Sequence, residues 1–181
     1  MFRTAFQTIG RRHLHASARQ NIQVGDTLPN IKVQLSSPAE TINVRDLFST
    51  SKKAILFGVP GAFTPGCSKT HLPGYIKAAE RLKTKQGVDL IACVSVNDAF
   101  VMTAWGKDVN LDTNNITLLA DSKGELAQSM NLAFDASGAL GNHRFQRFAA
   151  IIENGVVKKL FVEPDRTGLE VSLVENVEKH L

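Results

Sequence analysis

The sequence predicts an α/β fold in which a central mixed β-sheet carries helices on both faces. Short apolar runs typical of strands alternate with segments whose apolar residues recur every three or four positions, and this alternation is typical of α/β layer folds. Near the C-terminus, two apolar runs flank Asn154-Gly155, a strong signal for an antiparallel hairpin. With 181 residues, the chain is long enough for one domain with a full hydrophobic core.

The expected strands are short, apolar and bounded by turn residues. They lie within residues 24–35, 40–44, 54–59, 88–96, 116–120, 147–152 and 156–162. The first two read as a hairpin-like entrance. The runs at 54–59 and 88–96 are continuously apolar, which is typical of strands buried on both faces.

The expected helices follow from apolar periodicity and capping residues. They lie within residues 44–50, 65–83, 97–105, 126–130 and 169–181. Pro73 must kink or split the second of them, because proline has no N–H to donate. A glycine-rich loop is expected after residue 130, and a turn over residues 164–168.

The charge distribution separates the first twenty residues from the rest. Residues 1–20 carry four arginines and no acidic residue; the whole chain has 21 basic and 17 acidic residues, so the remainder is neutral. An arginine-rich, acid-free leader resembles a mitochondrial transit peptide, and a basic arm that touches nucleic acid or an anionic membrane is the alternative. We therefore expect a cleaved leader at 1–20, a folded domain at 21–181 and a location in the mitochondrial matrix.

Composition and cysteine usage exclude several classes of protein. No apolar run approaches the ~20 residues of a membrane-spanning helix, and a neutral body does not favour nucleic-acid binding. Neither kind of partner is expected. The two cysteines, Cys67 and Cys93, form no C-x-x-C motif and cannot build a disulfide framework. The histidines are scattered, so neither a metal site nor a cofactor is expected.

One cysteine lies in an unusual stretch, GVPGAFTPGCSKTH at residues 58–71. Thr64 suits a helix N-cap and Pro65 the first helical position, which makes Cys67 the third helical residue. It would lie at the carboxyl end of a central strand, where unpaired amides and the helix dipole favour a thiolate. Gly66 would let the backbone approach a small ligand closely.

The residues around this cysteine match a known family. Pro60-x-x-x-Thr64-x-x-Cys67 fits the P-x-x-x-T-x-x-C signature of peroxiredoxins. The longer strings GVPGAFTPGCSKTHLPGY, ACVSVNDAF, RFQRFAAIIENG and VEPDRTGLEVSL are similar to the peroxiredoxin V and plant type II subfamily. The resemblance covers essentially everything after the leader. It implies a thioredoxin-like fold and thiol-dependent reduction of hydrogen peroxide and organic hydroperoxides.

The resemblance also implies roles for individual residues. Cys67 is expected to be the peroxidatic cysteine that cycles through sulfenic acid. Thr64 would bond the thiolate and the peroxide, Pro60 would shield the pocket, and Arg147 would be the active-site arginine. From the residue pattern alone, Arg144 is an equal candidate for that last role.

Three further residues are expected to bind substrate. Gly66 gives backbone access, and His71 lies one helical turn after Cys67, where it lines the pocket; direct acid–base catalysis by His71 is the alternative. Leu140 is expected on the pocket wall in place of a bulkier residue of the relatives, which leaves the substrate preference open.

The closing half of the cycle departs from some relatives. Mammalian peroxiredoxin V proteins carry a resolving cysteine where this chain has Val171. We therefore expect a one-cysteine cycle in which glutathione, glutaredoxin or thioredoxin reduces the sulfenic acid. The alternative is that Cys93 resolves it, although a mid-strand cysteine is more often a small buried hydrophobe.

Relatives form dimers through the edge that carries the active-site loop, so a homodimer is expected. Phe63, Phe100 and Trp105 are the candidate interface residues, and each also fits a core position. Two other functions compete with the peroxidase: a thiol–disulfide transferase of the same fold and a non-catalytic binding protein. The lack of C-x-x-C counts against the transferase.

Overall fold

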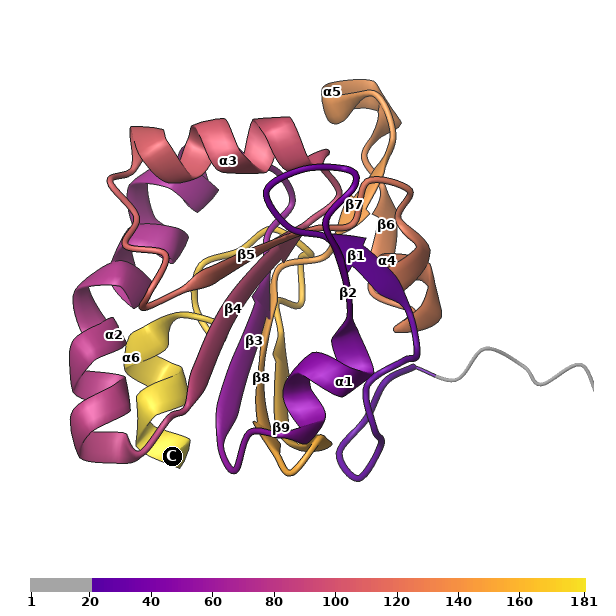
Figure 1. Cartoon of the computed structure of the whole chain (residues 1–181). Helices are drawn as coiled ribbons and strands as arrows, with labels where there is room; N and C mark the ends of the chain where they lie inside the picture. The colour runs from indigo at the N-terminus through magenta and orange to yellow at the C-terminus, as the bar shows by residue number, and fades with distance from the viewer. Residues whose placement is uncertain (1–20) are drawn as a thin grey trace, which may run out of the picture.

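The computed structural model describes residues 21–181, which form a seven-stranded mixed sheet surrounded by helices (Figure 1). The strand order is β2-β1-β5-β4-β3-β8-β9. Its members are β1 (Lys32–Gln34), β2 (Thr41–Asn43), β3 (Ala54–Gly58), β4 (Leu90–Ser95), β5 (Thr117–Ala120), β8 (Phe148–Glu153) and β9 (Val156–Val162). The three central strands β3, β4 and β5 are parallel and the flanking pairs are antiparallel. The predicted leader lies outside the described residues.

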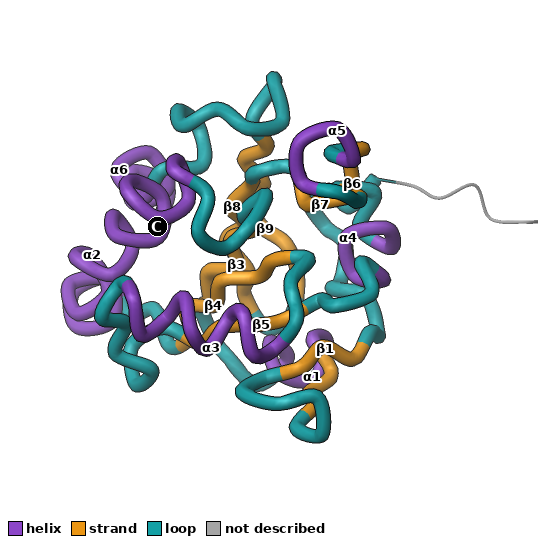
Figure 2. The backbone as a smooth tube through the Cα atoms, turned by 90° about the horizontal axis from the view of Figure 1, so that it is seen from above, coloured by secondary structure: helices purple, strands orange, loops and turns teal. Residues whose placement is uncertain are grey.

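Helices cover both faces of the sheet, as predicted. They are α1 (Val44–Ser49), α2 (Leu72–Gln86), α3 (Ala99–Asp108), α4 (Glu125–Ser129), α5 (Ser137–Leu140) and α6 (Val174–Val177), with a π-helical turn η1 (Cys67–His71) and a 3-10 turn η2 (Glu178–His180). Figure 2 shows α2 and α6 on one side of the strands and α4 on the other. The α2, α3 and α6 side packs into one apolar core, and α1 and α4 into a second.

The continuous apolar run of β3 serves both cores at once. Ile55 and Phe57 point into the core under α2, whereas Ala54 and Leu56 point into the core under α1 and α4. Successive side chains of a strand face opposite sides, so a strand covered on both faces needs apolar residues at every position. The run therefore fixes β3 as a central strand, and its carboxyl end leads into the cysteine loop.

The C-terminal hairpin places Arg147 beside that loop. Asn154 and Gly155 both have positive φ, 50° and 76°, as a two-residue hairpin turn requires. Strand β8 begins at Phe148, one residue later than predicted, and pairs antiparallel with β3 so that Phe148 lies opposite Gly58. Arg147 therefore lies just before β8, beside the carboxyl end of β3.

Two regions differ from the sequence prediction. The expected glycine-rich loop contains a second, two-stranded sheet of β6 (Ala133–Asp135) and β7 (His143–Phe145) around α5. The expected helix over 169–181 is helical only from Val174 onward. Residues 169–173 instead continue the preceding loop, because their backbone groups bond to buried side chains rather than to one another.

Among residues 21–181, none of the helices is long and apolar enough to span a bilayer. The same residues include no cluster of three or more His, Cys, Asp or Glu side chains arranged to hold a metal ion.

Candidate active site

The loop after β3 ends in a helix start that carries Cys67. Helical backbone begins at Pro65, and the Thr64 carbonyl accepts the first helical bond, from Ser68 N at 2.9 Å. Thr64 is therefore the N-cap residue and Cys67 the third helical residue, as the sequence predicts. The Cys67 side chain is fully buried, so it is shielded from bulk water.

The cysteine also begins a π-helical turn. The Leu72 amide donates to the Cys67 carbonyl, five residues earlier, and α2 follows with Pro73 at its second position. Because Pro73 lacks an N–H and its ring crowds the preceding turn, regular α-helical bonding cannot continue through this segment. Such π-helical turns are rare in proteins, and those that occur often lie at functional sites. The Trp105 Nε1 donates to Ser68 Oγ at 2.9 Å and anchors the turn to α3.

Arg147 connects the cysteine to its surroundings. Its Nη1 donates to Cys67 Sγ at 3.3 Å and to His71 Nδ1 at 3.3 Å, and its Nε donates to the Thr167 carbonyl at 3.2 Å. Arg147 is buried, so its charge is unscreened by bulk water and favours a negatively charged sulfur beside it. A guanidinium that donates to a thiolate forms a charge-assisted hydrogen bond, one of the stronger kinds in proteins.

His71 is an acceptor for Arg147. Arginine can only donate, so Nδ1 of His71 carries the lone pair and Nε2 carries the proton, which it donates to the Ser172 carbonyl at 3.1 Å. The Tyr75 hydroxyl donates to the same carbonyl at 2.9 Å. Burial, followed by the positive charge of Arg147, lowers the pKa of His71 from 6.5 to about 3. A group that stays neutral at physiological pH orients the arginine, and the acid–base alternative for His71 is not favoured.

The lowered pKa of His71 predicts a loss of stability in mild acid. As the pH falls below 6.5, the unfolded chain binds a proton that folded His71 refuses until about pH 3, so the stability present above pH 6.5 is lost progressively toward pH 3. One such group costs about 1 kcal/mol between pH 6.5 and pH 5.5. Urea unfolding across this range should show a slope in wild type that His71→Gln lacks. His180→Gln, at an exposed histidine, should keep the slope; equal slopes in all three proteins would contradict the assignment.

Gly66 serves the arginine, which sequence reasoning missed. A Cβ at this position would lie 3.0 Å from Nη2 of Arg147 and 3.3 Å from Cδ1 of Leu169. The φ of Gly66 is −65°, which any residue adopts. The glycine is therefore required by the close packing of the guanidinium and not by backbone conformation. The expected access for a ligand at this position is filled by Arg147 itself.

Gly66→Ala should therefore slow the reaction of Cys67 without unfolding the protein. The added methyl group pushes the guanidinium away from the sulfur, and we expect a decrease of about tenfold in the reaction rate with peroxide, the equivalent of ~1.4 kcal/mol. Gly74→Ala is the matched control, because its Cβ would meet only Val174 Cγ1 at 3.4 Å, an ordinary contact. Equal rates in stopped-flow measurements on both variants would contradict the role of Gly66.

The loop before the cysteine is held from its other side by Arg144. Its Nη1 donates to the Val96 carbonyl at 2.9 Å and to Asn97 Oδ1 at 3.3 Å, and the same Oδ1 accepts from Ala62 N at 3.0 Å. Arg144 therefore supports the loop, whereas Arg147 is the arginine that contacts the sulfur. The two arginines differ because Arg144 belongs to the second sheet in β7, whereas Arg147 lies at the edge of the main sheet.

Pro60 and Thr64 lie in the same loop. Pro60 is buried at the end of β3, and the Thr64 hydroxyl donates to the Gly61 carbonyl at 2.8 Å. Because its hydrogen is engaged, this hydroxyl presents lone pairs to any other partner. The predicted bond between Thr64 and the sulfur is not among the contacts of this state.

Cys93 and Leu140 occupy less direct positions. Cys93 is fully buried in β4 beside Phe57 of β3. Burial, and then the neighbouring Cys67, raises the pKa of Cys93 well above its ordinary value, which makes it a poor nucleophile at neutral pH. Leu140 is half-buried at the end of α5, and its carbonyl accepts from Arg144 Nη2 at 3.1 Å. Leu140 therefore contacts Arg144, which supports the loop, and Cys93 lies in the core. The hydrogen bond to the reacting sulfur comes from Arg147.

A buried cysteine at a helix start, paired with a buried arginine at the end of a thioredoxin-like sheet, defines a thiol-based redox protein. Comparison with known proteins makes this specific, since the chain matches the Redoxin family over residues 23–177. It therefore belongs to the redoxin family, and plant type II peroxiredoxins are among its relatives.

Three relatives illustrate the similarity. Peroxiredoxin-2E-2, chloroplastic, of Oryza sativa subsp. japonica is 46% identical over 149 residues, 78% of this chain and 65% of the relative. Peroxiredoxin-2E, chloroplastic, of Arabidopsis thaliana is 43% identical over 150 residues, which are 79% of this chain and 62% of the relative. Reduced Prx3 of Vibrio vulnificus, solved in complex with H2O2, is 47% identical with a TM-score of 0.80, over 88% of this chain and 99% of that one. The chain thus spans less than two thirds of the two plant proteins' length.

The same comparison corrects the expected location. A mitochondrial matrix location rests only on residues 1–20, which lie outside the described residues. The two plant relatives are named as chloroplastic proteins. The prediction of a mitochondrial location is therefore wrong on this comparison, because an arginine-rich, acid-free composition is shared by mitochondrial and chloroplast targeting segments.

Proposed function

We propose that the chain is a thiol-dependent peroxidase that reduces hydrogen peroxide and organic hydroperoxides through Cys67. The observation that carries the proposal is the 3.3 Å contact from the buried Arg147 guanidinium to Cys67 Sγ. A cation at this distance favours the thiolate, which is the form that attacks peroxide. The similarity to a Prx3 that was solved with bound H2O2 supports the same substrate class.

The first half-reaction needs charge stabilisation on both oxygens. The Cys67 thiolate attacks one oxygen of ROOH, the O–O bond breaks, and the leaving oxygen takes a proton to become an alcohol or water. Two electrons leave the sulfur, and Cys67 becomes a sulfenic acid. Arg147 can donate to the oxygens as negative charge develops, and the amides of the first helical turn, at Gly66 and Cys67, have no partner within the helix and can donate as well.

Thr64 and Pro60 complete the pocket in this proposal. The Thr64 hydroxyl already donates to Gly61, so it offers a lone pair to the O–H of a peroxide that lies over the sulfur. Buried Pro60 has no N–H to leave unsatisfied and helps exclude water from the thiolate. Gly66 and His71 act here by setting the position of Arg147. Leu140 acts through its carbonyl, which accepts a hydrogen bond from Arg144.

An external thiol closes the cycle in this proposal. Cys93 is buried inside β4 with a raised pKa, and Val171 stands where some relatives have a resolving cysteine. A small or protein-borne thiol such as glutathione, glutaredoxin or thioredoxin would condense with the sulfenic acid, releasing water and leaving a mixed disulfide. A second thiol would then release Cys67 as the thiol.

The proposal is tested by comparing two reactions of the purified chain. We expect rapid consumption of hydrogen peroxide with dithiothreitol as reductant, and no acceleration of insulin disulfide reduction. After peroxide treatment without reductant, a dimedone adduct should form on Cys67. Disulfide reduction without peroxide consumption would favour the thiol–disulfide transferase; neither reaction would favour the non-catalytic binding protein.

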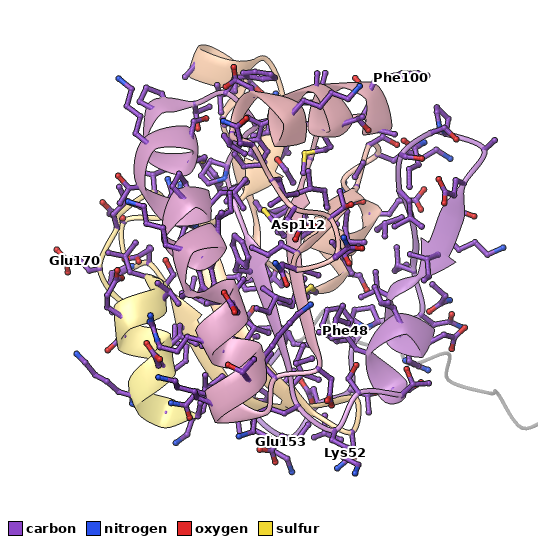
Figure 3. All side chains as sticks on the ribbon, turned by 60° about the vertical axis from the view of Figure 1, so that its left-hand side comes forward. Phe48, Lys52, Phe100, Asp112, Glu153 and Glu170 are labelled. Atoms are coloured by element: carbon purple, nitrogen blue, oxygen red, sulfur yellow. The ribbon has the colours of Figure 1, made fainter. Side chains whose placement is uncertain are left out.

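We also propose that the chain forms a homodimer through the edge that carries Cys67. Two large apolar side chains are exposed there, Phe63 at 52% and Phe100 at 65%, and Figure 3 shows Phe100 at the N-terminal end of α3, directed outward. The loop that carries Phe63 is joined to the segment before α3 by the bond from Ala62 N to Asn97 Oδ1, and Phe63 has a positive φ of 62°. Trp105 is fully buried and belongs to the core.

Exposed aromatic residues at one edge are typical of protein interfaces, which gives a direct test of this dimer. Phe100→Asp should shift the chain toward the monomer in light scattering after gel filtration. Val24→Asp, at an exposed apolar residue outside that edge, should leave the mass unchanged. Identical masses for wild type and Phe100→Asp would contradict the interface.

The division of the chain into residues 1–20 and a domain at 21–181 also remains a proposal. The described fold starts at residue 21, and the Redoxin match starts at residue 23. Removal of residues 1–20 should therefore leave peroxide consumption unchanged, and a lost activity would contradict the division.

A further inference from the structure

A loop that contributes no reacting group holds both neighbours of Cys67. Within residues 163–172, the Thr167 carbonyl accepts from Arg147 Nε at 3.2 Å, and the Ser172 carbonyl accepts from His71 Nε2 at 3.1 Å. Arg147 and His71 are themselves joined at 3.3 Å. The position of the guanidinium against the sulfur therefore depends on where this loop places two backbone oxygens.

A buried carboxylate holds the loop in this shape. Oε1 of Glu163 accepts three hydrogen bonds, from Glu170 N at 2.9 Å, from Ser172 N at 2.9 Å and from Ser172 Oγ at 2.7 Å. Glu163 is only 1% exposed. Because the carboxylate binds the backbone amides of Glu170 and Ser172, these amides are not available for helical hydrogen bonds. This explains why the helix predicted to begin at residue 169 starts only at Val174.

The same residue is tied to the arginine through the backbone. Glu163 N donates to the Arg147 carbonyl at 3.0 Å, and Arg147 N donates to the Arg166 carbonyl at 2.7 Å. Gly168 makes room for two carboxylates, since a Cβ there would lie 2.7 Å from Oδ1 of Asp165 and 3.1 Å from Oε2 of Glu163. Glu163 thus holds both ends of the loop that contacts Arg147 and His71, the first through its backbone amide and the second through its carboxylate.

We propose that Glu163 is a positioning residue for the peroxidatic centre: its carboxylate folds residues 163–172 so that the Thr167 and Ser172 carbonyls lock Arg147 onto Cys67. It acts through geometry, since no contact joins its carboxylate to the sulfur or to the guanidinium. The inference rests on the proposed function, but its test can be read from the thiol without peroxide.

Two variants separate geometry from charge. Glu163→Gln loses the charge but keeps an oxygen of the same reach, and it should behave like wild type. Glu163→Asp keeps the charge but is one methylene shorter, and it should lose the bond to at least one of the two amides. In Glu163→Asp we expect the rate of Cys67 alkylation by iodoacetamide at pH 7 to fall about tenfold and the peroxide rate to fall about 10–100-fold, the range known for residues that orient metal ligands.

The control lies on the same loop. Glu170→Ala removes an exposed carboxylate whose side chain points away from the protein (Figure 3) and leaves its backbone amide in place for Glu163. It should keep both the alkylation rate and the peroxide rate. Circular dichroism at low temperature establishes that each variant is folded before the measurements are compared.

The outcomes are distinct. Wild-type behaviour of folded Glu163→Asp would overturn the proposal, as would loss of function in Glu163→Gln with retention in Glu163→Asp, which would make the charge decisive. If the aspartate variant does not fold, Ser172→Ala removes one of the three bonds and should slow the alkylation of Cys67 about twofold; an unchanged alkylation rate would overturn the proposal. A wild-type chain that consumes no peroxide would defeat the proposed function and leave the alkylation result readable.

Discussion

Cys67→Ser is expected to abolish peroxide consumption with dithiothreitol. A serine hydroxyl is not ionised at neutral pH and cannot be oxidised to a sulfenic acid, so no second residue at this site can substitute for the sulfur. The buried position, with an arginine at 3.3 Å, tolerates serine because the hydroxyl can accept the same hydrogen bond. Initial rates at fixed peroxide concentration, compared with wild type, check the prediction.

Cys93→Ala is the matched control for this experiment. Cys93 is fully buried among apolar residues of β4, so alanine avoids burying a hydroxyl without a partner. The variant should keep its turnover with added thiol, because an external thiol closes the cycle. Residual activity in Cys67→Ser would contradict the peroxidatic role of Cys67. A Cys93→Ala variant that reacts once and then stops, or a Cys67–Cys93 disulfide in oxidised wild type, would instead favour Cys93 as the resolving cysteine.

Arg147→Gln should reduce the second-order rate constant with hydrogen peroxide by about 10²–10³-fold, the loss typical for one donor that stabilises developing charge. The guanidinium supplies the positive charge beside the sulfur and a donor to the breaking O–O bond. Glutamine keeps a donor amide but loses the charge and the reach to His71 and Thr167. Stopped-flow fluorescence under pseudo-first-order conditions gives the rate constant directly.

Lys69→Gln is the control for charge alone. Lys69 is exposed and lies two residues after Cys67, where solvent screens its charge. Its loss should change the rate less than about twofold. If Lys69→Gln and Arg147→Gln were equally slow, the effect would come from net charge, and the specific contact of Arg147 with the sulfur would carry no weight.

Much of the fold was predictable, because local physics decides it. A continuous apolar run identified β3 as a central strand, and Asn154-Gly155 identified the hairpin of β8 and β9. Both depend on side-chain alternation and turn conformation, which are properties of a few adjacent residues. The strands β6 and β7 escaped prediction, since three-residue strands beside glycines carry almost no periodicity.

The candidate site divides in the same way. The helix cap at Thr64 and the position of Cys67 follow from neighbouring residues and were predicted correctly. The acceptor role of His71, the packing of Arg147 against Gly66 and the loop around Glu163 were missed. Each joins residues far apart in the chain, and a buried carboxylate in VEPDRTGLEVS is indistinguishable in sequence from an exposed one.

By itself, the sequence determined the type of fold, the location of the thiol at a helix start and the family to which the chain belongs. The resemblance already selected Arg147 over Arg144, and the structure shows its contact with the sulfur. Only the tertiary structure decided that His71 is a neutral acceptor and that residues 169–173 are loop. The physical reason is that these outcomes depend on burial and on hydrogen bonds between distant residues. A charged or polar side chain removed from water takes whatever partners the fold brings to it.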